Sequence, residues 1–286
     1  MPAQGWHGKV RREMWCEVRC QETHEKRQVR RKQRNDGRQV RSKMRSQMRS
    51  KVRSQELMAV SRVGLSKQAG GATRAAGLCL LETYADLAHR KAHLLGSLLA
   101  GKPPKQWAHY PQDDAIDVES GFQWFYHSHA LEDRTDSGEH GHIHLFARRR
   151  LWSRRLRSDR EIQFAQLLGD PEHCFNTRHL LCIGFDAKGL PTSLFTVNSW
   201  VTGDLMLSAQ TTADLLGQLT LSTGNTDVDA VVESLIRLYR KEIRALLDAR
   251  DTCLFSSHCG KVLADESLEV LSELEINVDE KLASVL

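Results

Sequence analysis

Five histidines lie close together in two segments, Tyr126-His127-Ser128-His129 and Glu139-His140-Gly141-His142-Ile143-His144-Leu145-Phe146. In both segments the histidines recur at every second residue. Residues i and i+2 of an extended strand point to the same side, so the histidines of each segment share one face. We therefore predict two strands, over residues 121–130 and 139–150, that each carry a row of imidazoles.

The segment between these strands, residues 131–138, reads LEDRTDSG and is polar and turn-prone. This composition predicts that the two strands pair as an antiparallel hairpin. In that pairing we expect His127 opposite His144 and His129 opposite His142, with Cβ atoms about 5 Å apart. Imidazoles at such a distance are close enough to bind one metal ion.

Further elements are predicted on both sides of this hairpin. Apolar residues at helical spacing indicate helices over residues 73–101, 157–170, 227–250 and 263–286. A second hairpin is indicated over residues 178–186 and 190–201, and a connector rich in Pro and Asp over residues 107–120. Strands bracketed by helices favour an α+β fold, with a small antiparallel sheet of four to five strands covered by helices.

The net charge of +5 is unevenly distributed along the 286 residues. Residues 1–57 contain 17 Lys and Arg against 6 Asp and Glu, and residues 40–55 repeat one tetrapeptide as VRSK-MRSQ-MRSK-VRSQ. A segment with so few large apolar residues does not bury enough surface to fold, so we predict a disordered basic tail. A nucleic-acid arm and an inert tail remain open interpretations, and we expect Met58 to be the true start of a single domain over residues 58–286.

The seven cysteines are an odd number and form no CxxC pair, which is typical of reduced thiols. No apolar run reaches the roughly 18 residues that span a bilayer, and the first residues lack the apolar region of a secretory signal. The expected protein is therefore cytoplasmic and makes no membrane contact.

The histidine rows predict a site for a divalent metal, Zn²⁺ or Fe²⁺. Three histidine ligands with an open position suit a hydrolase or an oxygenase, whereas four histidines without one suit a binding module. His142 is also a candidate catalytic residue, and Glu139 is a candidate ligand or general base. The candidate metal ligands are His127, His129, His140, His142, His144 and His179.

Two motif similarities offer alternative chemistry. The sequence from His140 to Phe146 resembles the histidine-triad signature of nucleotide hydrolases and transferases, which would make His142 a nucleophile without any metal. His127, His129 and His140, with Ser137, are similar to the motif of JAMM-type metalloproteases, although His140 stands where that family has aspartate. A further alternative is a polar pocket or a structural role without metal.

From about Trp107 to Ile276 the chain resembles an uncharacterised, mainly bacterial domain family of unknown function. The motifs that carry the resemblance are a Trp and a Pro before Tyr-His-x-His, then Glu-His-Gly-His-x-His-Leu-Phe, His-Leu, and Leu-Phe-Thr-x-Asn-x-Trp-Val-Thr-Gly. They lie here at residues 107–111, 126–129, 139–146, 179–180 and 194–203. The resemblance supplies no activity.

The last of these motifs suggests a ligand-binding row. If the strand continues through residue 201, Asn198 and Trp200 face one side, where they would bind a planar cofactor or small-molecule substrate above the histidines. An anionic substrate is a second candidate, because six arginines follow the histidine strand. They are Arg148, Arg149, Arg150, Arg154, Arg155 and Arg157.

Overall fold

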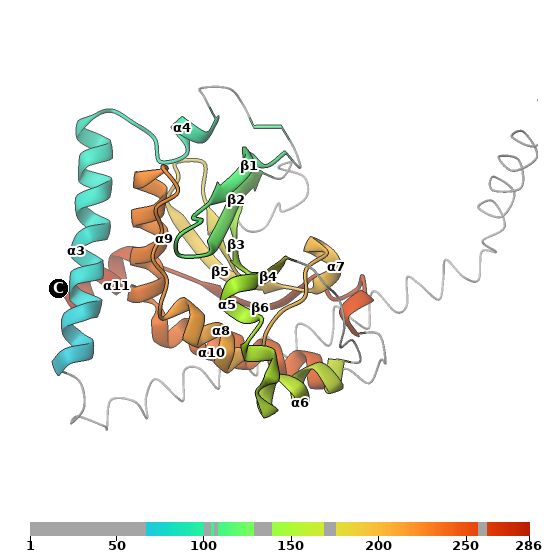
Figure 1. The fold of residues 1–286 in the computed structure, drawn as a ribbon. Helices are drawn as coiled ribbons and strands as arrows, with labels where there is room; N and C mark the ends of the chain where they lie inside the picture. Colours follow the sequence, from blue (N-terminus) through green and yellow to red (C-terminus); the bar gives the residue numbers. More distant parts are fainter. Residues whose placement is uncertain (1–66, 100–103, 106–107, 129–138, 169–175, 257–261) are drawn as a thin grey trace, which may run out of the picture. The chain divides into compact units, whose positions relative to one another are not determined.

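The computed structural model describes residues 67–99, 104–105, 108–128, 139–168, 176–256 and 262–286 (Figure 1). These residues all belong to one compact unit, Arg62–Leu286. The expected basic tail, the proposed start at Met58 and the candidate ligand His129 lie outside the described residues.

The fold is a mixed helix and strand architecture around one antiparallel sheet (Figure 1). Each strand pairs with the next one along the chain, so the order across the sheet is β1-β2-β3-β4-β5-β6. The strands are β1 Tyr110–Ile116, β2 Phe122–Ser128, β3 Gly141–Arg148, β4 Thr177–Phe185, β5 Pro191–Val197 and β6 Val270–Glu275.

The described sheet thus has six strands where four to five were predicted. Strand β1 lies in the predicted connector, whose Pro111, Asp113 and Asp114 are poor strand formers. Strand β6 lies in a segment that was predicted to be helical. Its sequence VLSELE has no clean alternation of apolar and polar residues, so the sequence pattern did not indicate a strand. Both missed strands are at the two edges of the sheet, where one side of the backbone has no neighbouring strand.

Helices precede, interrupt and follow the strands (Figure 1). The predicted helix over residues 227–250 is two helices, because the backbone of Tyr239 leaves the helical region between them. The predicted helix over 73–101 ends early, and Lys91 adopts a left-handed conformation after it. The α-helices are α3 Lys67–His89, α4 Gly96–Leu99, α5 Arg149–Trp152, α6 Asp159–Leu168, α7 Ser199–Thr202, α8 Ala209–Leu216, α9 Thr226–Leu238, α10 Arg240–Ser256 and α11 Val278–Val285, and η1 Arg155–Arg157 and η2 Val262–Ala264 are short 3₁₀ helices.

The central strands are buried on both faces, and the two faces differ in chemistry. One face carries Trp124 and Tyr126 of β2 and Ile143 of β3, which join the main hydrophobic core with residues of α3 and α9. A buried hydrogen bond of 2.9 Å from Nε1 of Trp124 to Oδ1 of Asp229 ties this face to α9. The opposite face carries the histidines, so the helical layer holds the sheet rigid beneath them.

The pairing of β2 with β3 differs from the expected register by two residues. His127 lies opposite His142, and Ser128 lies opposite Gly141. The observed register suits Gly141, because a Cβ atom there would meet the backbone oxygen of His127 and lie 2.5 Å from the hydroxyl oxygen of Tyr126. A shift of two residues leaves every side chain on its predicted face, so the histidine rows still face each other.

Candidate metal centre

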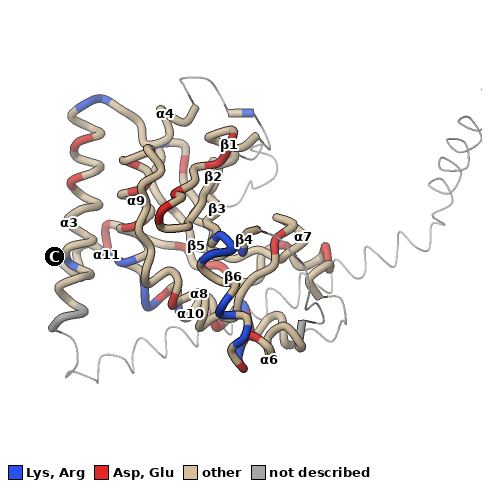
Figure 2. The backbone as a smooth tube through the Cα atoms, viewed as in Figure 1, with Lys and Arg blue, Asp and Glu red and all other residues tan. Residues whose placement is uncertain are grey.

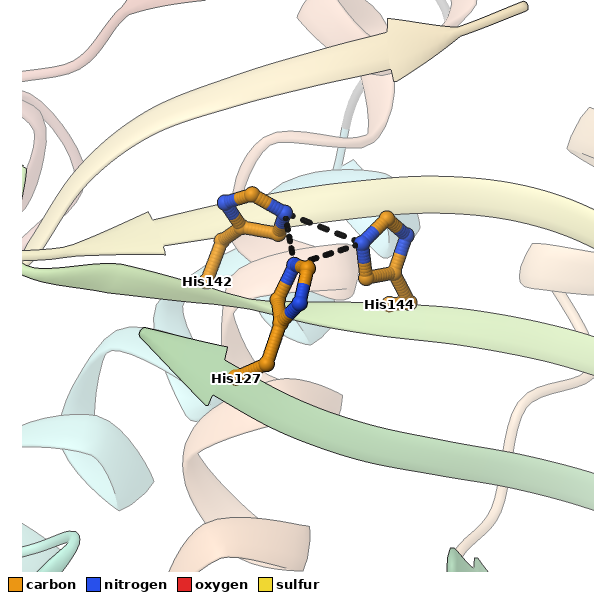
Figure 3. Close-up of side chains that lie close together, drawn as sticks. All are labelled: His127, His142 and His144. Atoms are coloured by element: carbon orange, nitrogen blue, oxygen red, sulfur yellow. Dashed lines mark hydrogen bonds between the residues drawn. The ribbon is translucent and has the colours of Figure 1, made fainter. Parts of the chain in front are cut away.

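Three buried imidazoles converge on one point above the sheet (Figure 3). Nε2 of His127 lies 2.7 Å from Nε2 of His142 and 3.1 Å from Nε2 of His144. The third edge, between Nε2 of His142 and Nε2 of His144, measures 2.9 Å. We call these three residues the histidine triangle.

The sheet itself positions the histidine triangle. His142 and His144 are alternate residues of β3, and His127 reaches them from β2, where it is the cross-strand partner of His142. Aromatic rings flank the triangle on the same face. The ring centroid of Phe125 lies 5.0 Å from that of His144, and the ring centroid of Phe195 lies 5.0 Å from that of His142. Rigid strands and bulky neighbours therefore restrict the imidazoles to few rotamers.

A buried carboxylate lies behind the histidine triangle. Oε1 of Glu139 is 2.7 Å from Nδ1 of His142, and its Oε2 accepts a hydrogen bond of 3.3 Å from the hydroxyl of Ser193. Gly184 leaves room for this contact, since a Cβ atom on Gly184 would lie 2.6 Å from Oε2 of Glu139. Because a carboxylate accepts, Nδ1 of His142 donates, so in the neutral form of the ring Nε2 carries the lone pair, inside the triangle.

Three neutral ring nitrogens in mutual contact do not form hydrogen bonds along all three edges of the triangle. A neutral imidazole nitrogen is either an N–H donor or a lone-pair acceptor, and it does not act as both. Among three such nitrogens, at least two must be of the same kind, so one edge of the triangle always sets two lone pairs or two N–H groups against each other. A cation bound by all three lone pairs removes this conflict, so the arrangement is compatible with a metal ion.

The size of the triangle indicates which coordination geometry fits. At metal–nitrogen distances of about 2.0 to 2.1 Å, tetrahedral angles separate two ligand nitrogens by about 3.3 Å, and right angles by about 2.9 Å. The three edges of 2.7, 2.9 and 3.1 Å agree better with right angles. Three ligands at right angles occupy one face of an octahedron and leave up to three positions for other ligands.

Two more potential ligands lie next to His144. Its Nδ1 is 3.2 Å from Nε2 of His179 and 3.2 Å from Sγ of Cys182, both on β4. Burial, and secondly the positive charge of Arg250, lower the pKa of His179 to about 3, so this imidazole is neutral at physiological pH. The sequence predicted His179 as a ligand or supporting residue. It gave no role to Cys182, because residues three apart in a regular strand point to opposite faces.

The other candidates in the described part of the chain, His140, Asn198 and Trp200, make different contacts. Burial, and then the charge of Glu139, raise the pKa of Tyr126, so its hydroxyl keeps its proton, and its oxygen forms a hydrogen bond of 2.8 Å with Nδ1 of His140. Asn198 is not in a strand but caps α7, with its side chain bonded to Ser199 N–H and to the carbonyl of Val262. Trp200 lies within α7, so the two residues do not form the expected strand row.

The predicted arginine run lies just after the C-terminal end of β3. Figure 2 shows positive charge along the segment that includes α5 and η1. Arg149, Arg150, Arg154 and Arg157 are exposed, whereas Arg178 of β4 is buried with its guanidinium 3.9 Å from the ring centroid of Trp152. Binding of an anionic substrate at this patch remains a prediction.

Comparisons with known proteins identify a family without a known activity. No curated protein and no solved structure matches the chain. Among the helices that the structure describes, none is both long and apolar enough to cross a membrane. The family described as "Domain of unknown function (DUF6969)" matches residues 74–276, which include all of β1 to β6, so the chain belongs to this family.

Proposed function

We propose that this protein is a metalloprotein that binds one divalent transition-metal ion through Nε2 of His127, His142 and His144. The observation that carries the proposal is the mutual approach of these nitrogens to within 2.7 to 3.1 Å in a buried setting. A cation supplies the positive charge that three facing lone pairs need, and first-row transition metals favour imidazole ligands.

Glu139 supports the ion indirectly in this proposal. Its carboxylate holds Nδ1 of His142, on the opposite side of the ring from the triangle. A carboxylate in that position fixes the ring orientation and makes Nε2 more basic, as in many carboxylate–histidine–metal arrangements. We therefore assign Glu139 to orienting a ligand, in place of the ligand or general-base role considered from sequence.

The chemistry we propose for the centre is oxidative, with Fe²⁺ as the ion. Three ligands on one face leave positions where a substrate and O₂ can bind side by side. The neighbouring rings of Phe125 and Phe195 give an apolar surrounding that suits O₂. Hydrolysis at Zn²⁺ also requires a group that takes the proton of the attacking water, and Glu139 is already engaged with His142.

The proposal is tested by measuring the metal content of the full chain and of two variants. His142→Ala removes one corner of the triangle, and His140→Ala removes a nearby imidazole that contacts Tyr126. We expect the wild type and His140→Ala to hold the same amount of metal, and His142→Ala to hold about one equivalent less. Far-ultraviolet circular dichroism of each variant separates loss of the metal from loss of the fold.

A separate experiment tests which metal ion binds and whether this ion keeps a free coordination position. After anaerobic loading with Fe²⁺, nitric oxide should give the electron paramagnetic resonance signal of an iron–nitrosyl adduct, because the ion keeps a free position. Loading without such a signal would contradict an open iron site. Tight retention of Zn²⁺ in place of Fe²⁺ at the histidine triangle, lost in His127→Ala, would contradict the oxidative role and favour hydrolysis.

A further inference from the structure

A second group of potential ligands shares one residue with the histidine triangle. Nδ1 of His144 lies 3.2 Å from Nε2 of His179 and 3.2 Å from Sγ of Cys182. The same Sγ lies 3.4 Å from Nε2 of His179. All three side chains are buried, with Cys182 wholly inaccessible to solvent.

An irregularity of β4 brings His179 and Cys182 to the same face. Residues three apart in a regular strand point to opposite sides of the sheet. Here Leu145 pairs with Leu181 and Phe146 pairs with His179, so Leu180 has no counterpart on β3. This bulge reverses the alternation and turns His179 toward His144, an arrangement that bulges often provide next to functional sites.

We propose that Nδ1 of His144, Nε2 of His179 and Sγ of Cys182 form a second metal site, which binds a thiophilic ion such as Zn²⁺ or Cu⁺. His144 then bridges two ions, with Nε2 on the first and Nδ1 on the second. Binding forms one metal–sulfur and two metal–nitrogen bonds and releases two protons to solvent, one from the Cys182 thiol and one from Nδ1 of His144. The bridge rests on the proposed function, whereas the contacts of Cys182 and His179 do not.

The distances in this second group suit a metal. With metal–sulfur bonds of about 2.3 Å and metal–nitrogen bonds of about 2.05 Å, sulfur and nitrogen ligands are about 3.1 to 3.6 Å apart for angles between right and tetrahedral. The two observed sulfur–nitrogen distances, 3.2 and 3.4 Å, both lie in that interval. The nitrogen–nitrogen distance of 3.2 Å also lies between the values for these two angles.

The ligand types make the two sites different in metal preference. The histidine triangle offers only nitrogen, which binds Fe²⁺, Zn²⁺ and similar ions without strong discrimination. The second group adds a thiolate, and thiolates favour zinc and monovalent copper. A protein with both sites would thus hold two ions, one of them recognisable by its sulfur ligand.

The test uses the full chain, stripped of metal by a chelator and then titrated with Co²⁺, which substitutes for Zn²⁺ and reports its ligands by absorption. We expect two equivalents in the wild type and a thiolate-to-cobalt charge-transfer band in the near ultraviolet. Cys182→Ser should lose one equivalent and this band. Cys253→Ser, which changes a cysteine outside the group, should keep both.

A variant of the first site makes the two proposals distinguishable. His127→Ala should lose one equivalent of bound metal but keep the thiolate band, because His127 is not one of the ligands of the second group. One equivalent without a thiolate band in the wild type would overturn the second site and leave the first intact. Two equivalents retained in both Cys182→Ser and Cys182→Ala would also overturn it, and circular dichroism confirms that each variant is folded.

Discussion

Oε1 of Glu139 lies 2.7 Å from Nδ1 of His142, and both side chains are buried. This contact selects the tautomer of His142 that presents a lone pair to the other two histidines. The orientation of the triangle therefore depends on a carboxylate that is not one of its corners.

Glu139→Gln should weaken metal binding without removing a ligand. The amide has no negative charge, and its NH₂ group opposes the N–H of His142 if it faces that atom, so we expect about a 10- to 100-fold loss of affinity. Competition with a chromogenic chelator measures this change. Glu266→Gln alters an exposed carboxylate and should leave affinity unchanged, and equal affinities for both variants would contradict the role of Glu139.

Gly184→Ala should disturb the same contact from the opposite side. A Cβ atom at residue 184 would meet the Ser193 hydroxyl and lie 2.6 Å from Oε2 of Glu139, so the carboxylate must move. We expect weaker metal binding and a loss of about 1 to 3 kcal/mol in the free energy of unfolding, measured by denaturant titration. The control is Gly71→Ala, where an added Cβ atom meets nothing on α3, and it should be neutral or stabilising. Unchanged metal affinity and an unchanged free energy of unfolding in Gly184→Ala would contradict the prediction.

Asp229→Ala should destabilise the fold beneath the site. It removes the acceptor for the indole N–H of Trp124 and for the backbone N–H and hydroxyl of Thr223. Because the indole N–H is buried, we expect a loss of about 1 to 3 kcal/mol. Asp227→Ala removes a partly exposed ion pair with Arg90 at the first turn of α9 and should cost clearly less, so similar losses in the two variants would contradict this prediction.

Asp117 should make stability depend on pH. Burial raises the pKa of this carboxyl, but hydrogen bonds from Ser120, Ser222 and Glu119 outweigh burial and lower the pKa below its ordinary 3.8. A group whose pKa falls on folding stabilises the protein above its unfolded pKa, and this contribution is lost as pH falls through the folded value.

Asp117→Asn should therefore be less stable than the wild type at pH 7, by about 1 to 3 kcal/mol, and the difference should shrink below pH 3.8. Urea titrations at several pH values measure both free energies of unfolding. The exposed Asp113→Asn serves as the control. A difference that stays constant down to the lowest pH would contradict the linkage.

The sequence predicted the central strands well because their signal is local. Alternation at every second residue places His127, His142 and His144 on one face, and the structure confirms that they meet. The register was wrong by two residues, since the pattern of histidines does not encode contacts between strands such as the close approach of Gly141 to His127 and Tyr126.

Other features were not accessible from sequence for similar reasons. Cys182 and His179 share a face of the sheet because strand β4 has an extra residue, Leu180. Such a bulge interrupts the alternation of side chains between the two faces, on which the prediction of faces from sequence depends. Strand β6 is an edge strand stabilised by pairing with β5, far away in sequence. His140 continues the period of His142 and His144, yet it precedes the strand and contacts Tyr126.

X-ray absorption at the metal edge of the reconstituted full chain is the most direct test of the histidine triangle. We expect an ion with imidazole nitrogen ligands at about 2.0 to 2.1 Å, and the loss of this signal in His142→Ala but not in His140→Ala. An ion surrounded only by oxygen ligands, or the same spectrum from His142→Ala, would contradict the claim that His127, His142 and His144 bind a metal.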